Sequence, residues 1–328
     1  MEVSILPLHR TLDVRSGDNL LEALREHQVP VSFSCMSGRC GTCRCRIVSG
    51  NVLMTGAAET NLPARNGQTV LACQATVVED CVIEIPEVDE IVTHPSKIIK
   101  TTVIGIDDLT HDIKRLRLSL SKPFEFSPGQ YASLQFTPQH VRPYSMAVTA
   151  DDSEVEFHVR VVPGGRATSY VATQLKIGDS VRLSGPLGTA YLRRKTPDPI
   201  VCIAGGTGLA PILSIVRGMA DHGMVNPVHV YFGVRSPHDI YGTHWLDALK
   251  ERLPNLTVHV VVTTANDPGP YRTGVVTDAV NQDWDSFKGW RAYVAGAPVM
   301  VEAASILLRQ KGMMPEHIYA DAFYSSGV

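Results

Sequence analysis

Four cysteines lie at the spacing that an iron–sulfur cluster requires. Cys35, Cys40 and Cys43 follow the pattern C-x4-C-x2-C, and 29 residues separate them from Cys73. This is the plant-type ligand pattern of a [2Fe–2S] cluster, in which one loop supplies three thiolates and a distant segment supplies the fourth. A zinc site would show two C-x2-C pairs about 15–20 residues apart, whereas this chain has one such pair. The sequence therefore predicts a metal site formed by these four residues.

The surroundings of the four cysteines support this interpretation. Gly38 and Gly41 lie inside the predicted loop, where a residue without Cβ lets backbone N–H groups approach the cluster. Cys45, Cys81 and Cys202 fall outside the ligand pattern. We interpret these three as buried, apolar-like residues, because burial is the common fate of a free cysteine.

A second group of residues is suited to a cofactor that carries both a ring and phosphates. In the string Arg142-Pro143-Tyr144-Ser145, Pro143 stiffens the turn, Arg142 can face a pyrophosphate, Tyr144 can lie along a ring, and Ser145 presents a hydroxyl. By itself the string also fits an ordinary strand end that holds an Arg and a Tyr. It gains weight from the residues that follow it: His158, Arg160, Gly164, Gly165, Arg166 and Thr168.

The glycine pair at 164–165 precedes hydroxyl residues at the start of an expected helix. Unpaired N–H groups and the helix dipole make such a helix start a potential anion site. We therefore expect the phosphates of a flavin nucleotide to lie there.

A third group is suited to a dinucleotide. Gly205, Gly206, Thr207 and Gly208 follow an apolar strand expected at 200–204 and precede a helix expected over 212–219. A strand, a Gly-rich turn and a helix in this order can cradle a phosphate, although the G-x-G-x-x-G spacing is not present. The ends of later strands add Arg235 and Asp239, where an adenosine ribose would be recognised, and Gly296 and Pro298, beside the nicotinamide.

The elements that would position these residues fall into three regions. We expect short strands around one helix, over 19–28, in residues 1–90, and a linker between Pro86 and Pro95. Residues 96–195 read as short strands with Pro-Gly and Gly-Gly turns, which predicts an antiparallel β-barrel. Residues 196–328 alternate apolar strands with helices, which predicts a doubly wound parallel sheet.

Charge differs between these regions. Residues 1–90 have a net charge of −5, residues 91–195 of +5 and residues 196–328 of −3. Opposite net charges would favour docking of the first two domains, although ordinary surface variation explains the difference equally well. No concentrated basic face suggests a nucleic-acid partner.

Nothing in the sequence suggests a membrane partner. The longest apolar stretch, 201–216, contains three glycines and is shorter than the roughly 18 residues of a spanning helix. Residues 1–10 do not show the pattern of a targeting signal, and we expect a cytoplasmic protein.

Taken together, these strings resemble the ferredoxin–NADP reductase superfamily with an amino-terminal ferredoxin domain. The chain is most similar to the reductase components of aromatic-ring-hydroxylating dioxygenases, and among them to the naphthalene dioxygenase reductases. The resemblance extends over essentially all 328 residues. It is carried by the strings FSCMSGRCGTCRCR, DEIVTHP, PFEFSPGQYA, RPYSMA, SGPLGTAYLR, GGTGLAP, YFGVRS and HIYADAFY.

The resemblance implies a multi-domain α+β and α/β protein. Its parts would be a β-grasp [2Fe–2S] ferredoxin domain (1–90), an antiparallel β-barrel FAD domain (96–195) and a doubly wound parallel-sheet NAD(P) domain (196–328). It implies hydride transfer from NADH, with NADPH also accepted, to FAD. Single electrons would then pass through the cluster to a Rieske-type ferredoxin or a terminal oxygenase.

The resemblance also assigns roles to single residues. Arg142 would bind the FAD phosphates and Phe323 or Tyr324 would cover the flavin. Tyr144, packed on the isoalloxazine, and Ser145, near flavin N5, are the candidate catalytic residues. Gly165, Arg166 and Thr168 would lie at the FAD pyrophosphate, and Gly206, Thr207 and Gly208 at the dinucleotide.

Two positions depart from the family pattern. Many relatives carry a Cys where this chain has Ala295 and a Glu where it has Asp321, and we assign neither position a proton-transfer role. Two other functions fit the same layout. One is the reductase of a salicylate or di-iron aromatic monooxygenase, and the other is a flavin and iron–sulfur redox sensor.

Overall fold

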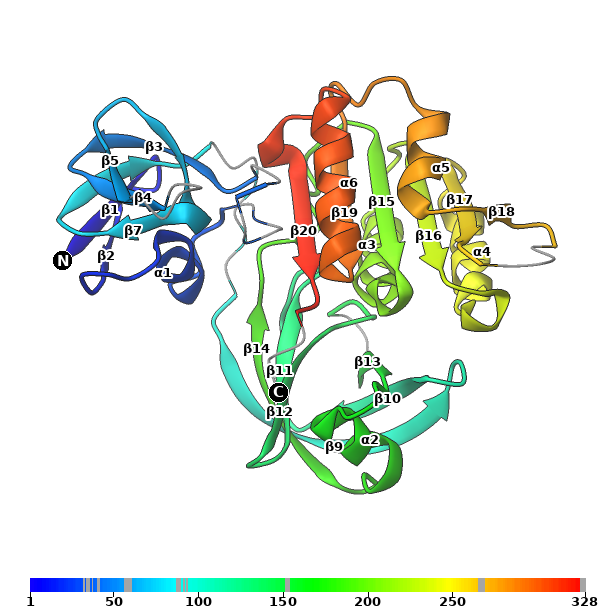
Figure 1. Cartoon of the computed structure of the whole chain (residues 1–328). Helices are drawn as coiled ribbons and strands as arrows, with labels where there is room; N and C mark the ends of the chain where they lie inside the picture. Colours follow the sequence, from blue (N-terminus) through cyan, green and yellow to red (C-terminus); the bar gives the residue numbers. More distant parts are fainter. Residues whose placement is uncertain are drawn as a thin grey trace.

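The structure is a computed structural model of the whole chain. It describes residues 1–328 except 32, 34–35, 37, 40–41, 56–60, 87–89, 91, 93, 151–153, 265–268 and 325–328. The described strands form four sheets that belong to three regions placed around a common centre (Figure 1). The expected classes of architecture are confirmed by a mixed sheet, an antiparallel sheet and a parallel sheet in chain order. The domain boundaries themselves remain a prediction.

The amino-terminal region packs one helix across a mixed sheet. The sheet has the order β2-β1-β8-β3-β6, with β1 and β8 parallel, and a smaller sheet has the order β5-β4-β7. The strands are β1 (Glu2–Leu6), β2 (Arg10–Asp13), β3 (Arg44–Ser49), β4 (Val52–Thr55), β5 (Asn61–Ala64), β6 (Thr69–Leu71), β7 (Ala75–Val77) and β8 (Cys81–Glu84).

The helix expected over 19–28 is α1 (Leu20–Glu26). Its start is fixed by Asn19, whose side-chain oxygen accepts hydrogen bonds from the backbone N–H groups of Leu21 and Glu22. Leu20, Leu21 and Leu24 are fully buried against the sheet, as their spacing predicts. One short 3-10 turn, η1 (Ala72–Gln74), follows β6 and carries Cys73.

The middle region is a six-stranded antiparallel sheet that closes on itself. Its order is β12-β11-β14-β9-β10-β13. The two edge strands meet through an isolated bridge between Met146 and Phe157, which brings the end of β12 to β13. The elements are β9 (Lys97–Asp108), β10 (Ile113–Leu120), β11 (Tyr131–Thr137), β12 (His140–Ser145), β13 (Glu154–Arg160), α2 (Arg166–Thr173) and β14 (Ser180–Leu187).

The carboxy-terminal region is a parallel sheet with helices on both faces. One face is covered by α3 and α4, and the other by α5 and α6, each over its own apolar core. The strands are β15 (Ile200–Gly205), β16 (Val228–Val234), β17 (Leu256–Val262), β18 (Arg272–Thr273), β19 (Arg291–Gly296) and β20 (Ile318–Ala322). The helices are α3 (Leu209–Asp221), α4 (Thr243–Arg252), α5 (Val276–Asp283) and α6 (Pro298–Gln310), and the 3-10 turns are η2 (Gly206–Gly208), η3 (Pro237–Asp239) and η4 (Pro315–His317).

The strand order of this sheet locates a ligand site. The order β18-β17-β16-β15-β19-β20 runs outward from β15 in both directions, so the chain changes direction between β15 and β19. In open α/β sheets ligands bind beyond the carboxyl ends of the strands at this switch point. The Gly-rich turn η2 follows β15 and Gly296 ends β19, so both lie there.

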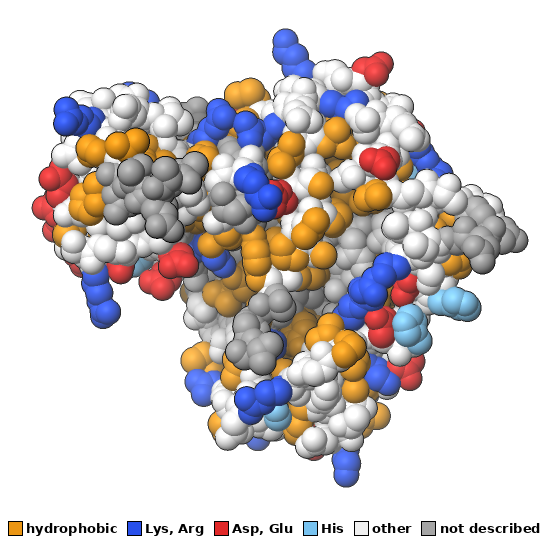
Figure 2. All heavy atoms as spheres, in the orientation of Figure 1, with side chains coloured by type: hydrophobic (Ala, Val, Ile, Leu, Met, Phe, Trp, Pro, Cys, Tyr) orange, Lys and Arg blue, Asp and Glu red, His pale blue; other side chains and the backbone are white. Residues whose placement is uncertain are grey.

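Backbone and side-chain contacts join the three regions. The Ser214 hydroxyl of α3 donates to the Val148 carbonyl (2.6 Å) and accepts from the Gly129 N–H (3.2 Å) of the barrel. In the predicted linker, the Glu90 carbonyl accepts a hydrogen bond from the Tyr191 hydroxyl (3.2 Å), and the Val92 N–H donates to the same hydroxyl (3.0 Å). The described part of the linker is therefore attached to the barrel. Hydrophobic side chains gather where the regions meet (Figure 2).

Within the described residues, no helix combines the length and the apolar character that crossing a bilayer requires.

Candidate functional site

Two of the four predicted metal ligands lie in described parts of the chain. Cys43 and Cys73 are buried, and the Ala72 N–H donates to the Cys43 carbonyl (2.8 Å), which holds the two segments together. Cys35 and Cys40 lie outside the described residues. A hydrogen bond with the Cys43 side chain, together with the Gly38 backbone, lowers the pKa of Cys73 to about 6. Thiolate is the form that binds iron, so this pair fits a cluster.

The other three cysteines are buried, as predicted. Cys45, Cys81 and Cys202 are each at most 4% exposed. Burial raises the pKa of Cys45 to about 12 and that of Cys81 to about 11, and it also raises the pKa of Cys202. The raised pKa values keep these three thiols protonated, and their predicted burial is confirmed.

The strand β12 carries the residues predicted to hold a flavin. The Tyr144 hydroxyl is buried, and it has no hydrogen-bond partner among the described residues. Burial raises the pKa of Tyr144 to about 12, so the hydroxyl keeps its proton. A buried hydroxyl without a partner is costly, and a bound polar ligand would remove that cost. Arg142 lies two residues away on the same face of β12, and this pair fits the ring and phosphates of FAD.

Ser145 makes a contact across 176 residues. Its hydroxyl donates to Oδ2 of Asp321 on β20 at 2.6 Å. Burial raises the pKa of Asp321 to about 6, although the hydrogen bond from Ser145 and the positive charge of Arg25 each lower it. Sequence reasoning noted Asp321 only as a departure from the family pattern. Its pairing with Ser145 joins the barrel to the last strand of the parallel sheet.

The same contact places β12 at the switch point. In the sheet, Asp321 pairs with Ala295, directly before Gly296. The Phe323 N–H, just after β20, donates to the Gly296 carbonyl at 2.9 Å. The residues of β12 that are predicted to hold a flavin and the Gly-rich turns of the sheet therefore border one region.

The side chain of His158 is not available to a cofactor, which corrects the prediction that it binds one. Its ring is buried, with Nδ1 3.0 Å from the Tyr241 hydroxyl and Nε2 3.1 Å from Glu156 Oε1. Burial lowers its pKa, and the ring stacks on Trp245 with the centroids 5.7 Å apart. The Nδ1 contact joins the barrel to the parallel-sheet region, whereas Nε2 contacts Glu156 on the same strand, β13.

The predicted phosphate turn before α2 is formed as expected for its backbone. Gly164 has φ +74°, and Gly165 is the residue before the helix. The Thr168 hydroxyl donates to the Gly165 carbonyl (3.2 Å) and accepts from the Val162 N–H (3.3 Å). A Cβ on Gly165 would lie 2.5 Å from Thr168 Oγ1. The hydroxyl therefore shapes the turn, while Arg166 is exposed at the helix start.

Close backbone approach explains the glycines of the switch point. A Cβ on Gly208 would lie 2.0 Å from the Ala295 carbonyl oxygen, so only glycine fits beside β19. Gly296 has φ +140° and approaches the Gly205 carbonyl in the same way. Thr207 lies between these contacts in η2, and Pro298 is the first residue of α6.

The Arg160 guanidinium lies between the barrel and the Gly-rich turn. Its Nε and Nη2 donate to Asp112 Oδ2 at 2.8 and 2.7 Å. Its Nη1 is 3.4 Å from the position that a Cβ on Gly206 would take. Arg160 can therefore reach a phosphate held at the turn.

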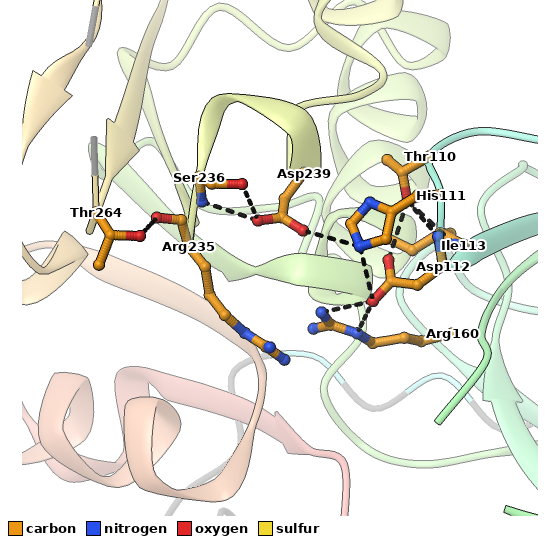
Figure 3. Close-up of polar contacts among 9 residues, drawn as sticks. All are labelled: Thr110, His111, Asp112, Ile113, Arg160, Arg235, Ser236, Asp239 and Thr264. Carbon is orange, nitrogen blue, oxygen red and sulfur yellow. Dashed lines mark hydrogen bonds and ion pairs between the residues drawn. The ribbon is translucent and has the colours of Figure 1, made fainter. Parts of the chain in front are cut away.

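Arg235 and Asp239 follow β16 and differ in availability (Figure 3). Asp239 Oδ2 accepts from both the N–H and the hydroxyl of Ser236, each at 2.8 Å, which closes the turn η3. The Thr264 hydroxyl donates to the Arg235 carbonyl at 2.7 Å. Figure 3 shows the Arg235 side chain extending away from Thr264, with no contact drawn to its guanidinium.

Three family models match the chain in succession. They describe a 2Fe-2S iron-sulfur cluster binding domain (residues 3–78), an oxidoreductase FAD-binding domain (residues 100–191) and an oxidoreductase NAD-binding domain (residues 202–305). The three matches fall on the three regions of the fold.

Full-length relatives share all three regions. The chain is 56% identical to the ferredoxin–NAD(P)+ reductase component of the naphthalene 1,2-dioxygenase/salicylate 5-hydroxylase systems of Ralstonia sp, over 100% of both chains. It is 55% identical to the corresponding component of the naphthalene 1,2-dioxygenase system of Pseudomonas putida, also over 100% of both. A solved ferredoxin reductase in carbazole 1,9a-dioxygenase is 28% identical, with a TM-score of 0.67 and 98% of each chain covered.

Proposed function

The chain belongs to the ferredoxin–NAD(P)+ reductase components of multicomponent oxygenases, and we propose that it supplies electrons to a dioxygenase that dihydroxylates naphthalene-like aromatic hydrocarbons. It is an electron-transfer enzyme with binding domains for a [2Fe–2S] cluster, FAD and NAD(P)H. FAD, when bound, accepts a hydride and releases electrons singly, which joins a two-electron donor to a one-electron cluster.

One observation carries the proposal. Ser145 of the barrel contacts Asp321, and Asp321 pairs with Ala295 beside Gly208 and Gly296 at the switch point. A ring held along β12 and a dinucleotide held at η2 would therefore meet at one place, as hydride transfer between two rings requires.

We propose these roles for the residues around that place. Arg142 and Tyr144 hold FAD, because the Tyr144 hydroxyl is buried and needs a polar partner. The start of α2, with Gly164, Gly165, Arg166 and Thr168, faces the FAD pyrophosphate. Ser145 and Asp321 border the reacting part of the flavin. Cys35, Cys40, Cys43 and Cys73 bind the cluster.

The dinucleotide would lie along the carboxyl end of the parallel sheet. The turn formed by Gly205, Gly206, Thr207 and Gly208 would hold its phosphates, with Arg160 beside it. Gly296, Pro298 and Phe323 would border the nicotinamide. Asp239 would act through the turn it closes, because one carboxylate oxygen already accepts two hydrogen bonds there.

For the coenzyme, we propose NADH with NADPH also accepted. Arg235 is exposed, and Figure 3 draws no hydrogen bond or ion pair from its guanidinium to the other residues shown, so we propose that it binds a ribose or its 2′-phosphate. Steady-state kinetics with both coenzymes tests this, and a strict NADPH preference would contradict it.

The acceptor we propose is a Rieske-type ferredoxin, working with a terminal oxygenase in the cytoplasm. A salicylate hydroxylase is the second candidate, because the Ralstonia relative is named for both systems. Stopped-flow reduction of purified Rieske ferredoxin, salicylate hydroxylase and di-iron monooxygenase proteins by this reductase and NADH decides among them. Fastest reduction of the Rieske protein is expected, and faster reduction of another acceptor would overturn the assignment. A redox sensor would instead turn over NADH slowly with every acceptor.

A further inference from the structure

The buried Tyr241 lies between the barrel and the Gly-rich turn of the parallel sheet. Its ring meets the rings of His158 and Phe232 edge-on, with centroids 5.3 and 5.7 Å apart. Its hydroxyl lies 3.0 Å from Nδ1 of His158 on β13 and donates to the Gly206 carbonyl of η2 at 3.4 Å. Tyr241 therefore links a strand of the barrel to the turn at which we place the dinucleotide phosphates.

His158, the first partner of this hydroxyl, is fixed by charged and aromatic groups. Its Nε2 is 3.1 Å from Glu156 Oε1, and Glu156 Oε2 accepts a hydrogen bond from Nε of Arg115 at 2.6 Å. The His158 ring also stacks on Trp245 of α4. The guanidinium carbon of Arg115 lies 5.3 Å from the centre of the Trp245 ring. A chain of contacts therefore runs from β10 through β13 to Tyr241 and the Gly-rich turn.

The two ends of the hydrogen-bonded part of this chain, Glu156 and Gly206, can only accept. Burial acts to raise the pKa of Glu156, but hydrogen bonds from His158 and Arg115 lower it to about 2, so the carboxylate stays ionised. Between the two ends, Tyr241 supplies one proton, because burial raises its pKa, and a neutral His158 supplies one. The three contacts from Glu156 to Gly206 require three protons. They are therefore all made only when His158 carries a proton on both ring nitrogens.

The Gly206 carbonyl determines where the N–H groups of the turn point. It also accepts from the backbone N–H of Leu209, the first residue of α3, so it points into the helix. The peptide bond from Gly206 to Thr207 is trans, so its N–H points the opposite way, out of the helix start. This is the direction in which a helix start binds phosphate. Gly206 has φ +55° and no side chain, so a contact from outside the turn limits its backbone freedom.

We propose that Tyr241 is a positioning residue for NAD(P)H: its hydroxyl orients the Gly-rich turn through the Gly206 carbonyl, and a second proton on His158 strengthens this contact. With a neutral His158, Nε2 donates to Glu156, and Nδ1 competes with the Gly206 carbonyl for the hydroxyl proton. With a doubly protonated His158, Nδ1 donates to the hydroxyl, whose own proton then goes to Gly206. The inference deepens the proposed function, and it rests on the proposed place of the dinucleotide phosphates at this turn.

The groups around His158 set the pH range of this effect. Burial lowers the pKa of His158 from its ordinary value of 6.5, and Glu156 acts to raise it. The positive charges of Arg217 on α3 and Arg115 on β10 lower it further. Tyr241, before α4, stays uncharged. Dinucleotide affinity should therefore rise as pH falls below the ordinary histidine value.

The test separates dinucleotide binding from hydride transfer in the holoenzyme. Stopped-flow reduction of FAD over a range of NADH concentrations gives a dissociation constant and a limiting rate. In Tyr241→Phe the dissociation constant should rise by about 3- to 10-fold, the value of one hydrogen bond, while the limiting rate and the FAD content stay unchanged. Tyr231→Phe is the matched control, because the Tyr231 hydroxyl donates to Asp283 at 2.8 Å and its ring belongs to the core on the other face of the sheet.

The pH profile gives a readout that a packing defect would not move. From about pH 7 to pH 5, the wild-type dissociation constant for NADH should fall by about twofold or more. Tyr241→Phe and His158→Gln should both lose this dependence. Asp321, with a pKa of about 6, titrates in every variant, so only the difference from the wild type is assigned to His158.

The outcomes separate this proposal from the proposed function. A dissociation constant of Tyr241→Phe equal to that of the wild type, a wild-type constant that does not fall in acid, or an equal fall in Tyr241→Phe would overturn the proposal. Arg160→Gln removes the cation proposed beside the same phosphates and should also weaken NADH binding. If only Arg160→Gln weakens binding, the role of Tyr241 fails and the proposed function stands. If neither variant weakens it, the proposed place of the dinucleotide fails.

Discussion

Single residues decide where the cofactors are held, and the clearest case is the buried hydroxyl of Tyr144. It has no partner among the described residues, although its ring packs against Phe136 and the barrel core. A buried hydroxyl without a partner costs stability, and a polar group of a bound cofactor would remove that cost.

Tyr144→Phe should therefore act in opposite directions on the two forms of the protein. Without FAD the variant should be as stable as the wild type or more stable, because an unsatisfied buried group is removed. With FAD the affinity should fall by about 3- to 10-fold, the value of one hydrogen bond. Flavin fluorescence titration and thermal unfolding of the apoprotein measure the two effects. An unchanged FAD affinity would refute the contact.

Asp321 should make stability depend on pH. Its pKa is raised from an ordinary value of 3.8 to about 6, so the folded protein binds a proton more tightly than the unfolded chain. The stabilisation is complete below the unfolded pKa and is lost as pH rises toward 6. Asp321→Asn should remove this dependence. Urea unfolding of both proteins across that range should show the free energy of unfolding of the wild type falling relative to that of Asp321→Asn as pH rises. A difference between the two proteins that does not change with pH would contradict this prediction.

At the residue scale, the sequence predicted the motifs better than it predicted the tertiary contacts of their side chains. The cysteine spacing assigns Cys73 to the cluster and leaves out Cys45 and Cys81, and only the predicted burial of the latter two is confirmed. The Ser145–Asp321 contact joins residues 176 positions apart, and no local pattern encodes it. His158 lies near the flavin motif in sequence, but only the tertiary structure shows Glu156 and Tyr241 taking its nitrogens.

At the scale of elements, the turn η2 can lie against the strand β19 at the switch point because Gly208 has no side chain. The helix expected over 212–219 begins earlier, at Leu209, because η2 leads directly into α3. Gly208, the residue before Leu209, lies against β19. A Cβ on Gly208 would be 2.0 Å from the Ala295 carbonyl oxygen. The apolar strand expected at 200–204 is β15 (Ile200–Gly205), one residue longer than predicted.

Gly208→Ala should separate η2 from β19. We expect a loss of several kcal/mol in stability, as for other severe backbone clashes, and a large loss of NADH binding with FAD retained. Gly223→Ala is the control, because Gly223 has φ +61° but open space around its Cα. That change should cost only about 1 kcal/mol. NADH titration and thermal unfolding compare the two, and equal effects would contradict the role of the close contact.

The strands β16 and β17 carry a half-buried histidine pair that should respond to acid. His229 and His259 stack with centroids 6.3 Å apart, and burial lowers the pKa of both. The unfolded chain therefore binds protons more readily, so stability should fall as pH drops below the ordinary histidine value of 6.5. Unfolding of the wild type and His259→Gln across this range measures the effect. If His259→Gln loses as much stability in acid as the wild type does, the loss of stability is caused by other groups.

At the scale of the whole molecule, net charge did not predict the contacts between domains. The opposite net charges of the amino-terminal region and the barrel had two equal interpretations, domain docking and ordinary surface variation. One described ion pair instead joins Arg39, a basic residue of this acidic region, to Glu302 of the carboxy-terminal region. Docking depends on which side chains lie at the interface, and a net charge does not locate them.

The central claim is that electrons pass from NADH through FAD and the cluster to an external protein within one chain. Cys73→Ser tests it most directly, with Cys81→Ser, a buried cysteine outside the ligand pattern, as the control. We expect Cys73→Ser to keep NADH-dependent reduction of ferricyanide while losing reduction of the Rieske ferredoxin, and Cys81→Ser to keep both. Undiminished reduction of the ferredoxin by a Cys73→Ser protein without a cluster would contradict the account.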